Sequence, residues 1–288
     1  MRRHRCAVLT NPRYTRRVRN PFAKCAAGAI AARARTVVAA LPALVAGLAL
    51  LTACDTPAPS DPIDAAVANP DRPATDRDRD LNRKPAEVMR FFDVRPGMTV
   101  LEMFSGGGYY VEVLARIVGP EGKVYAHNNS AHRRFLADAL ALRYRDQRLA
   151  NVIRLDTEAE DIQLAPASLD GVFLVLAYHD VYVRPDQNWP AIDRAAMLHA
   201  IFDALKPGAT LGVVDHIARP GDDPAEIATA LHRIDEGVVI RDIEQAGFVL
   251  EDRSGVLRNP ADDYQKRVFD PQIRGRTDRF VLRFRKPL

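Results

Sequence analysis

Three consecutive glycines directly after an apolar strand pattern constrain this chain more than any other feature. Residues 100–111 read VLEMFSGGGYYV: an apolar strand with a carboxylate at Glu102, the glycines, and then the start of an apolar helix. Glycine adopts positive φ and lets a ligand approach the main chain. A helix that begins just afterwards adds unpaired N–H groups and the positive end of its dipole. The segment therefore predicts an α/β sheet that binds a nucleotide-like ligand at the carboxyl end of its first strand.

Strand and helix patterns alternate along most of the chain. The segment 171–176 is continuously apolar, as expected when helices cover both faces of a parallel sheet. This alternation predicts an α/β fold with one parallel sheet between two layers of helices. Expected strands lie at 99–103, 123–127, 152–155, 171–176, 210–215, 248–252 and 279–285, and expected helices at 84–92, 109–118, 131–147, 192–205 and after Pro224.

The N-terminal segment has the pattern of an export signal. Residues 1–53 carry ten basic residues and no acidic residue, and they end in an apolar stretch. Leu51-Thr52-Ala53-Cys54 resembles the lipobox of bacterial lipoproteins, in which the cysteine becomes the lipid-modified N-terminus. We therefore expect a signal peptide at 1–53 and a protein anchored through Cys54 to the bacterial inner membrane, facing the periplasm. The alternatives are a chance match in an alanine-rich extension, or a misread translation start and a cytoplasmic protein.

The rest of the chain has a different charge from the leader. The full sequence has a net charge of +4, but residues 54–288 hold 31 basic and 37 acidic residues, a net charge of −6. This balance argues against a nucleic-acid partner. Residues 54–79 are rich in proline, small residues and alternating charges, which predicts a flexible linker. We expect one folded domain at 80–288, without an internal disulfide because Cys54 would be the last cysteine left.

The glycine run fits two common nucleotide-binding motifs poorly. Gly106 and Gly108 match the first two glycines of the dinucleotide motif G-x-G-x-x-G, but Val111 occupies the position of the third glycine. A phosphate-binding P-loop needs Gly-Lys-Ser/Thr after its glycines, and the sequence has Tyr-Tyr-Val. Glu102 would repel a pyrophosphate, whereas it suits a cofactor with an amino group or a sulfonium charge. These features indicate S-adenosylmethionine.

Residues 102–108 resemble the first motif of class I S-adenosylmethionine-dependent methyltransferases, roughly Asp/Glu-x-Gly-x-Gly-x-Gly, with Phe104 at the first glycine. The segments 123–128, 151–161 and 205–211 are similar, in the same order, to later motifs of that family, and the resemblance covers about 85–285. More narrowly, the chain looks like a group of predicted bacterial methyltransferases with Tyr-His-Asp after the fourth strand. The resemblance implies a Rossmann-like, mostly parallel seven-stranded sheet with an antiparallel C-terminal strand, and S-adenosylmethionine as cofactor.

The resemblance also implies which residues hold the cofactor. Asn128 stands where these enzymes usually place an acidic residue that binds both ribose hydroxyls. An amide accepts one hydrogen bond and donates another without charge assistance, which leaves weaker binding or a different ligand open. The expected cofactor-binding residues are Glu102, Phe104, Gly106, Gly107, Gly108, Asn128, Glu158 and Ala159.

Candidate acceptor-side residues follow the fourth and fifth strands. In Tyr178-His179-Asp180, His179 could act as a base near neutral pH and Tyr178 could line the methyl channel. The alternative is a structural His–Asp hydrogen bond. Asp215-His216 ends the fifth strand, where binding sites of open α/β sheets gather, although it could also cap the next loop.

Two further interpretations concern the same rim. Arg233, in the helical region after Pro224, could hold an anionic substrate or lie on a solvated helix face. Two His/Asp pairs on one rim would allow a metal site, but no HxxxH-type or Cys/His ligand spacing supports one, so the sequence predicts no metal.

The sequence therefore favours an S-adenosylmethionine-dependent methyltransferase that acts on a small-molecule or lipid-like acceptor. One alternative is an exported binding protein that has the same fold and transfers no methyl group. A second alternative, a nicotinamide-dependent oxidoreductase, is disfavoured by Val111 and by the missing ribose acid. The residues identify neither the acceptor atom nor the oligomeric state.

Overall fold

A seven-stranded sheet forms the centre of the computed structural model, which describes residues 61–288. Its strand order is β3-β2-β1-β4-β5-β7-β6; β7 runs antiparallel to both β5 and β6, and the other pairs are parallel. This sheet confirms the expected fold class. The strands are β1 (Thr99–Met103), β2 (Lys123–His127), β3 (Val152–Leu155), β4 (Leu169–Val175), β5 (Leu205–His216), β6 (Val249–Ser254) and β7 (Arg279–Arg285).

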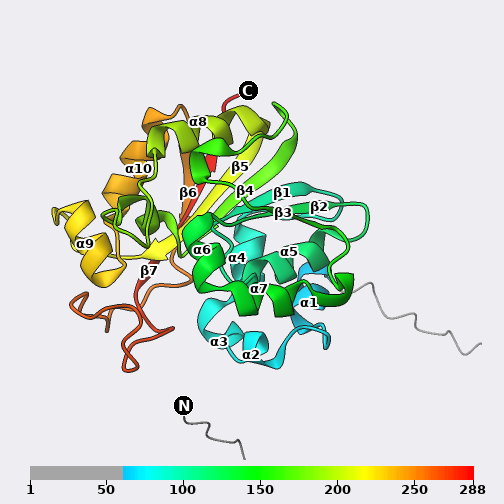
Figure 1. The fold of residues 1–288 in the computed structure, drawn as a ribbon, viewed down its shortest axis with the longest axis horizontal. Coiled ribbons are helices and arrows are strands. Elements are labelled where there is room, and N and C mark those ends of the chain that lie inside the picture. Colours follow the sequence, from blue (N-terminus) through cyan, green and yellow to red (C-terminus); the bar gives the residue numbers. More distant parts are fainter. Residues whose placement is uncertain (1–60) are drawn as a thin grey trace, which may run out of the picture. The chain divides into compact units, whose positions relative to one another are not determined.

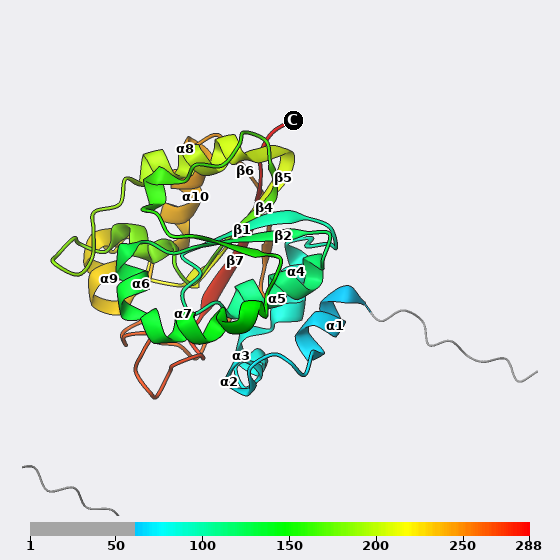
Figure 2. The same cartoon turned by 45° about the vertical axis from the view of Figure 1, so that its right-hand side comes forward.

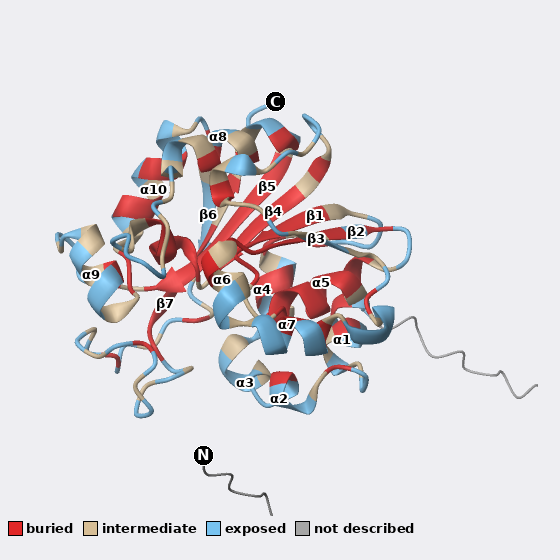
Figure 3. Cartoon of the chain, viewed as in Figure 1, coloured by how far each residue is buried: buried red, intermediate tan, exposed pale blue. Residues whose placement is uncertain are grey.

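Helices cover both faces of this sheet (Figures 1 and 2). One layer contains α1 (Pro62–Ala68), α4 (Pro85–Phe91) and α5 (Tyr109–Val118), and its apolar side chains share one core cluster with Val100 and Val124 of the sheet. The other layer contains α8 (Arg194–Ala204) and α10 (Glu236–Gln245), which pack on a second cluster. The central strands are buried between these layers (Figure 3), which explains their continuous apolar sequences.

The strand order reverses between β1 and β4. From β1 the chain builds outward to β2 and β3, and it then returns to the other side of β1 with β4. Ligands of open α/β sheets bind in the crevice at such a point, outside the carboxyl ends of the strands. The remaining elements are α2 (Ala74–Arg77), α3 (Asp80–Arg83), α6 (Ser130–Phe135), α7 (Ala137–Arg143), α9 (Pro224–Leu231) and the 3-10 turns η1 (Arg145–Gln147), η2 (Ala159–Asp161) and η3 (Tyr178–Tyr182).

The expected flexible linker at 54–79 is wrong for the part that the structure describes. Asp61 caps α1 by accepting a hydrogen bond from the backbone N–H of Ile63 at 2.8 Å, with proline at the first helical position. Ile63 and Ala66 are buried against the apolar cluster that contains α5. The folded domain therefore includes α1 and does not start near Asp80.

Ion pairs explain why the composition of the described part of this segment wrongly predicted a flexible linker. Arg72 is fully buried and forms a two-pronged ion pair with Asp80, at 2.7 and 2.8 Å. Asp76 is buried and lies 2.7 Å from the guanidinium of Arg143. Alternating charges usually indicate a solvated segment, but here they pair with partners, of which Arg143 is distant in sequence.

The single helix expected at 131–147 is divided into α6, α7 and η1. The break is at Leu136, whose φ of −118° and ψ of 17° depart from helical values. Phe135 and Leu142, two apolar residues of this segment, are 60% and 61% exposed. Leu136 instead lines a cavity beside the glycine loop. The change in helix direction therefore places this side chain at the cavity and not against the sheet.

The remaining boundaries agree closely with expectation. The strands at 99–103, 123–127, 152–155 and 279–285 and the helix at 109–118 are confirmed. β5 starts at Leu205, five residues before the expected start. Its pairing with β4 shifts register after Leu205, since β5 advances from Leu205 to Thr210 while β4 advances only from Leu169 to Gly171. The expected signal peptide and Cys54 lie outside the described residues. Within 61–288, no helix is long and apolar enough to cross a membrane.

Candidate functional site

A cavity of about 420 Å³ lies at the carboxyl ends of β1 and β4, where the strand order reverses. The glycine loop forms one wall, and the segment after β4 forms another. Two residues from the segment between β6 and β7, Val268 and Phe269, also contribute to the lining. The sequence-predicted residues that line this cavity are Glu102, Phe104, Gly106, Gly107, His179, Asp180 and His216.

The glycine loop needs left-handed backbone at three alternate positions. Gly106 has φ +57° and Gly108 has φ +78°, and Phe104 adopts φ +50° although it carries a side chain. A non-glycine residue in this conformation costs roughly 1–2 kcal/mol, which explains why the related motif has glycine there. The Phe104 ring is buried and packs edge-on against His127, with the ring centres 5.2 Å apart.

Asn128 holds the glycine loop in place. Its side-chain oxygen accepts a hydrogen bond from the backbone N–H of Gly106 at 2.9 Å. Its side-chain nitrogen donates to the Ser105 hydroxyl at 3.0 Å and to the Gly106 carbonyl at 3.2 Å. An aspartate could not make the two donated bonds, so an amide at this position has a structural reason that the sequence alone did not show.

Arg143 supports the loop from the opposite side. Its Nε donates to the Gly107 carbonyl at 2.9 Å, and its guanidinium pairs with Glu112 at 2.9 Å and with Asp76 at 2.7 Å. A Cβ added to Gly108 would lie 3.1 Å from the Arg143 side chain, so this glycine permits the contact. Sequence reasoning missed this network; its one signal was Glu112, a carboxylate inside an apolar helix.

Glu102 is a buried carboxylate that lines the cavity. It is 3% exposed, and its Oε2 has no hydrogen-bond partner among residues 61–288. Burial raises its pKa to about 8, although the charges of Arg83 and Arg143 act to lower the pKa. An unpartnered carboxylate in a cavity wall would gain most from a cationic ligand group. The residues of this wall therefore fit a ligand with an amino or sulfonium charge.

Glu158 and Ala159, two of the expected cofactor-binding residues, lie beside the end of β2. Glu158 accepts a hydrogen bond from the backbone N–H of Ser130 at 3.1 Å. Ala159 is fully buried at the start of η2. Neither residue lines the 420 Å³ cavity.

His179 is held by a buried carboxylate on β5. Asp215 accepts the backbone N–H of His179 at 2.8 Å, and its other oxygen lies 2.8 Å from His179 Nδ1. Burial alone would lower the pKa of His179, but the charges of Asp215 and Asp180 raise it to about 9. The ring is thereby oriented with Nε2 toward Asp180 Oδ1 and His232 Nδ1, each 3.3 Å away.

Two residues that sequence reasoning did not place in the site surround Asp180. His132 Nε2 lies 3.5 Å from Asp180 Oδ2, and the Trp189 indole N–H donates to the Asp180 carbonyl at 3.2 Å. Both side chains line the cavity. No spacing pattern connects these residues in the sequence, because α6 and the segment after η3 meet only in the folded sheet.

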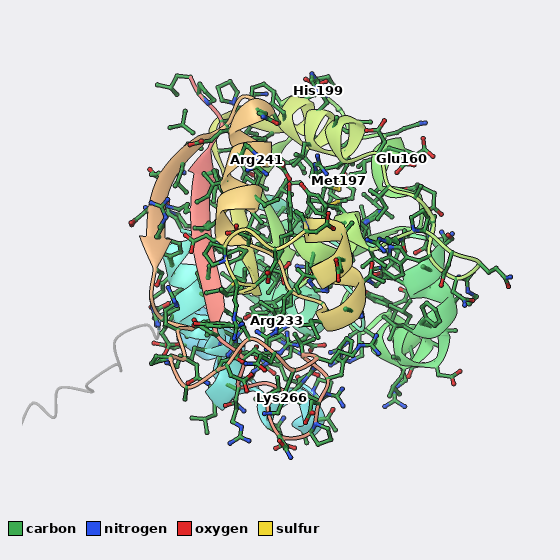
Figure 4. All side chains as sticks on the ribbon, turned by 90° about the vertical axis from the view of Figure 1, so that its left-hand side faces the viewer. Glu160, Met197, His199, Arg233, Arg241 and Lys266 are labelled. Atoms are coloured by element: carbon green, nitrogen blue, oxygen red, sulfur yellow. The ribbon has the colours of Figure 1, made fainter. Side chains whose placement is uncertain are left out.

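Seven of the predicted site residues that the structure describes do not line the cavity: Gly108, Asn128, Glu158, Ala159, Tyr178, Asp215 and Arg233. Tyr178 is fully buried, and its hydroxyl donates to Asp242 of α10 at 3.1 Å. Arg233 is also fully buried and forms a two-pronged pair with Asp262, at 2.9 and 3.0 Å. Its Nε donates to the Lys266 carbonyl, and Figure 4 labels both residues at the same end of the sheet.

A second cavity, of about 580 Å³, adjoins the first, and the two share the lining residues Arg79, Arg83, Leu176, His216, Val268 and Phe269. His216 Nδ1 lies 2.6 Å from the Thr277 hydroxyl, and burial together with nearby cations puts the pKa of His216 well below its usual value. Apolar residues and basic side chains alternate around this second cavity. Its arginines are Arg79, Arg83, Arg274 and Arg279.

Comparisons with protein sequences match the part of the chain that contains the glycine loop. A family model for protein-L-isoaspartate(D-aspartate) O-methyltransferase matches residues 83–154. The protein-L-isoaspartate O-methyltransferase of Methanothermobacter thermautotrophicus is 48% identical over 40 residues, which are 14% of this chain. The chain spans 18% of that relative's length.

Solved structures share the fold over a much larger part of the chain. An S-adenosylmethionine-dependent methyltransferase from Aquifex aeolicus matches with a TM-score of 0.53 and 22% identity, over 74% of this chain and 95% of that one. The [4+2]-cyclase SpnF matches with a TM-score of 0.51 and 18% identity, over 75% and 82% of the two chains. The chain therefore has a Rossmann-like class I methyltransferase fold.

Proposed function

We propose that this protein is an S-adenosylmethionine-dependent methyltransferase that acts on a small-molecule or lipid-like acceptor. The buried carboxylate of Glu102 in the wall of the cavity, whose Oε2 has no hydrogen-bond partner among residues 61–288, carries this proposal. The family match over 83–154 supports it, because that segment contains Glu102 and the whole glycine loop. The shared methyltransferase fold supports it independently.

The residues around the first cavity suit this cofactor. Glu102 would face its cationic part, and Gly106 and Gly107 would let it lie on the main chain. When bound, S-adenosylmethionine supplies a methyl group on a positively charged sulfur. The protein then has to bind the acceptor beside it in the correct orientation and exclude water.

His179 and Asp180 would face the acceptor. Both line the first cavity, and the hydrogen bonds to Asp215 fix the orientation of the His179 ring. The adjoining cavity combines apolar side chains such as Val268 and Phe269 with four arginines. We therefore propose an acceptor with an apolar body and an anionic group, since guanidinium groups pair well with carboxylates and phosphates.

The matched family and its curated relative are named for isoaspartate methylation. The match ends at residue 154, before His179, Asp215 and most of the second cavity. We therefore extend to this chain the cofactor of that family and leave its acceptor aside. A protein with the same fold is named as a [4+2]-cyclase, so the fold alone does not determine the reaction.

Calorimetric titration of the full chain with S-adenosylmethionine tests the proposal. We expect binding in the micromolar range, followed by transfer of a labelled methyl group to a component of a small-molecule or lipid extract. The full chain is used because α1 and α2 belong to the folded domain. Lack of binding at millimolar cofactor would contradict the proposal. Binding without transfer to any fraction would favour the binding-protein alternative, and binding of NADH instead would favour an oxidoreductase.

We also propose that the leader at 1–53 exports the protein and that Cys54 carries a lipid anchor to the inner membrane. The lipobox-like residues 51–54 support this location. In cells fed with radioactive palmitate, we expect label in the parent and in a Cys25→Ala control, but not in Cys54→Ala. Equal labelling of both variants would rule out the anchor. Because S-adenosylmethionine is made in the cytoplasm, this result also bears on where the protein meets its cofactor.

A further inference from the structure

We propose that His179, Asp180 and His232 form a binding site for one divalent transition-metal ion. A nitrogen of each histidine and a carboxylate oxygen of Asp180 all lie within 4.8 Å of one another. His179 Nε2 is 3.3 Å from Asp180 Oδ1 and 3.3 Å from His232 Nδ1. Bonds of about 2.1 Å to one ion separate neighbouring ligand atoms by roughly 3.0–3.4 Å in octahedral or tetrahedral geometry. Two of the three pairs therefore already have the spacing of metal ligands, and the third pair, His232 and Asp180, lies within 4.8 Å.

Hydrogen bonding alone satisfies these three groups poorly. Arg267 donates to His232 Nε2 at 3.1 Å, which leaves the proton of a neutral His232 on Nδ1, pointing at His179 Nε2. That contact requires a lone pair on His179 Nε2, whereas the contact with the Asp180 carboxylate requires a proton there. One nitrogen cannot meet both demands. An ion would remove the conflict, because all three atoms would then present lone pairs to it.

Asp215 prepares His179 to be a metal ligand. It accepts the proton of His179 Nδ1, so that Nε2 is the nitrogen that coordinates once an ion displaces its proton. Asp215 is itself fixed, because it also accepts the backbone N–H groups of His179 at 2.8 Å and His216 at 2.7 Å. A carboxylate behind the imidazole is the usual support of metal-binding histidines.

The ligand set selects the class of ion and leaves room for a second ligand. Two imidazoles and one carboxylate suit zinc, iron(II), cobalt or nickel better than magnesium or calcium, which prefer oxygen ligands. All three side chains line the 420 Å³ cavity, so the remaining coordination positions face the cavity. An ion there would be accessible to the oxygen or nitrogen atom of an acceptor, or to water.

The backbone at His232 supports the same geometry. His232 ends α9 in the left-handed conformation, with φ +55° and ψ +50°, and the contacts of α9 with η3 bring its ring to His179. Its other ring nitrogen faces only the exposed side chain of Arg267. That arginine can move away when Nε2 takes up the proton. We thus expect Arg267→Ala to bind the ion at least as tightly as the parent, and a loss of affinity would contradict the ligand assignment.

The direct test uses the full chain, stripped of metal with a chelator and titrated with zinc alone. We expect one ion per chain with a dissociation constant in the micromolar range or below, and a rise in the melting temperature with zinc concentration. His232→Asn and Asp180→Asn should each weaken binding by at least ~10–100-fold, the loss typical when even an outer partner of a metal ligand is removed. Asparagine tolerates the left-handed backbone at 232. Cobalt absorption should report nitrogen ligation in the parent and lose intensity in both variants.

The control is His199→Asn, which changes an exposed histidine on α8 (Figure 4). It should bind zinc like the parent. Lack of binding by the parent at millimolar zinc would overturn the proposal. Unchanged affinity in His232→Asn, or an equal loss in His199→Asn, would overturn it as well. Because the titration contains no S-adenosylmethionine, its outcome is independent of the proposed methyl transfer.

Discussion

Replacing Gly106 with valine is expected to weaken S-adenosylmethionine binding by at least ~100-fold while the domain stays folded. A Cβ at this position would have space, since the nearest atoms are 3.9 and 4.0 Å away. The backbone is the obstacle, because φ is +57° and a β-branched residue avoids that region. When the backbone leaves this conformation, both hydrogen bonds between Gly106 and Asn128 are lost, and the loop no longer fits the cofactor.

The matched control is Gly221→Val. Gly221 also has a positive φ, of +89°, with nothing within 4 Å of an added Cβ, and it lies in an exposed loop that does not line the first cavity. Both variants should stay folded in thermal unfolding, and Gly106→Val should lose more stability, because only Gly106 is hydrogen-bonded to Asn128. Calorimetry should detect the loss of cofactor affinity in Gly106→Val alone. Equal affinity in the two variants would show that the glycine loop does not bind the cofactor.

Glu102→Gln is expected to bind S-adenosylmethionine about 10–100-fold more weakly. Glutamine keeps the shape of glutamate but removes the negative charge, and a hydrogen bond to a charged group contributes about 1.5–3 kcal/mol. In the parent, burial raises the pKa of Glu102 to about 8. A cationic ligand needs the ionised form, so the parent should bind more tightly as pH rises from 6 to 8, by up to about tenfold per pH unit. The variant should show a flat profile over this range.

The same substitution should stabilise the ligand-free protein. The folded-state pKa of Glu102 lies above its value of 4.5 in an unfolded chain, so the folded state holds the proton more tightly. The stability contributed by the protonated group is full below pH 4.5 and is lost as pH rises toward 8. Thermal unfolding at pH 8 should give a higher midpoint for Glu102→Gln than for the parent. An exposed control, Glu121→Gln, should match the parent in both assays, and a pH-dependent affinity that survives in Glu102→Gln would contradict the role of this carboxylate.

Local sequence patterns predicted the sheet well. β1, α5, β2, β3 and β7 coincide with expectation because each is a short apolar or alternating segment bounded by turn residues. Local patterns failed where side chains pair with distant partners. The charged stretch before Asp80 folds because Arg72 and Asp76 find buried partners, and the helix at 131–147 breaks at Leu136, which lines the cavity.

The candidate site also has one wall that local sequence patterns predicted and one wall that they did not. The glycine loop and Glu102 are contiguous in the sequence, so the local chemistry of one strand and one turn was enough to predict an ammonium- or sulfonium-binding wall. The opposite wall comes from β5, η3, α9 and the segment before β7. His232 and His132 have no sequence spacing to His179 that a motif would show.

The sequence by itself determined the α/β fold and predicted the proposed cofactor side of the site, because both predictions rest on periodicity and on backbone conformations that single residues impose. Only the tertiary structure decided that Asn128 holds the loop, that Tyr178 and Arg233 are buried in internal contacts, and that His179, Asp180 and His232 converge. Those contacts join residues up to 64 positions apart, as between Tyr178 and Asp242. Their geometry depends on how the strands are ordered in the sheet, which no local pattern encodes.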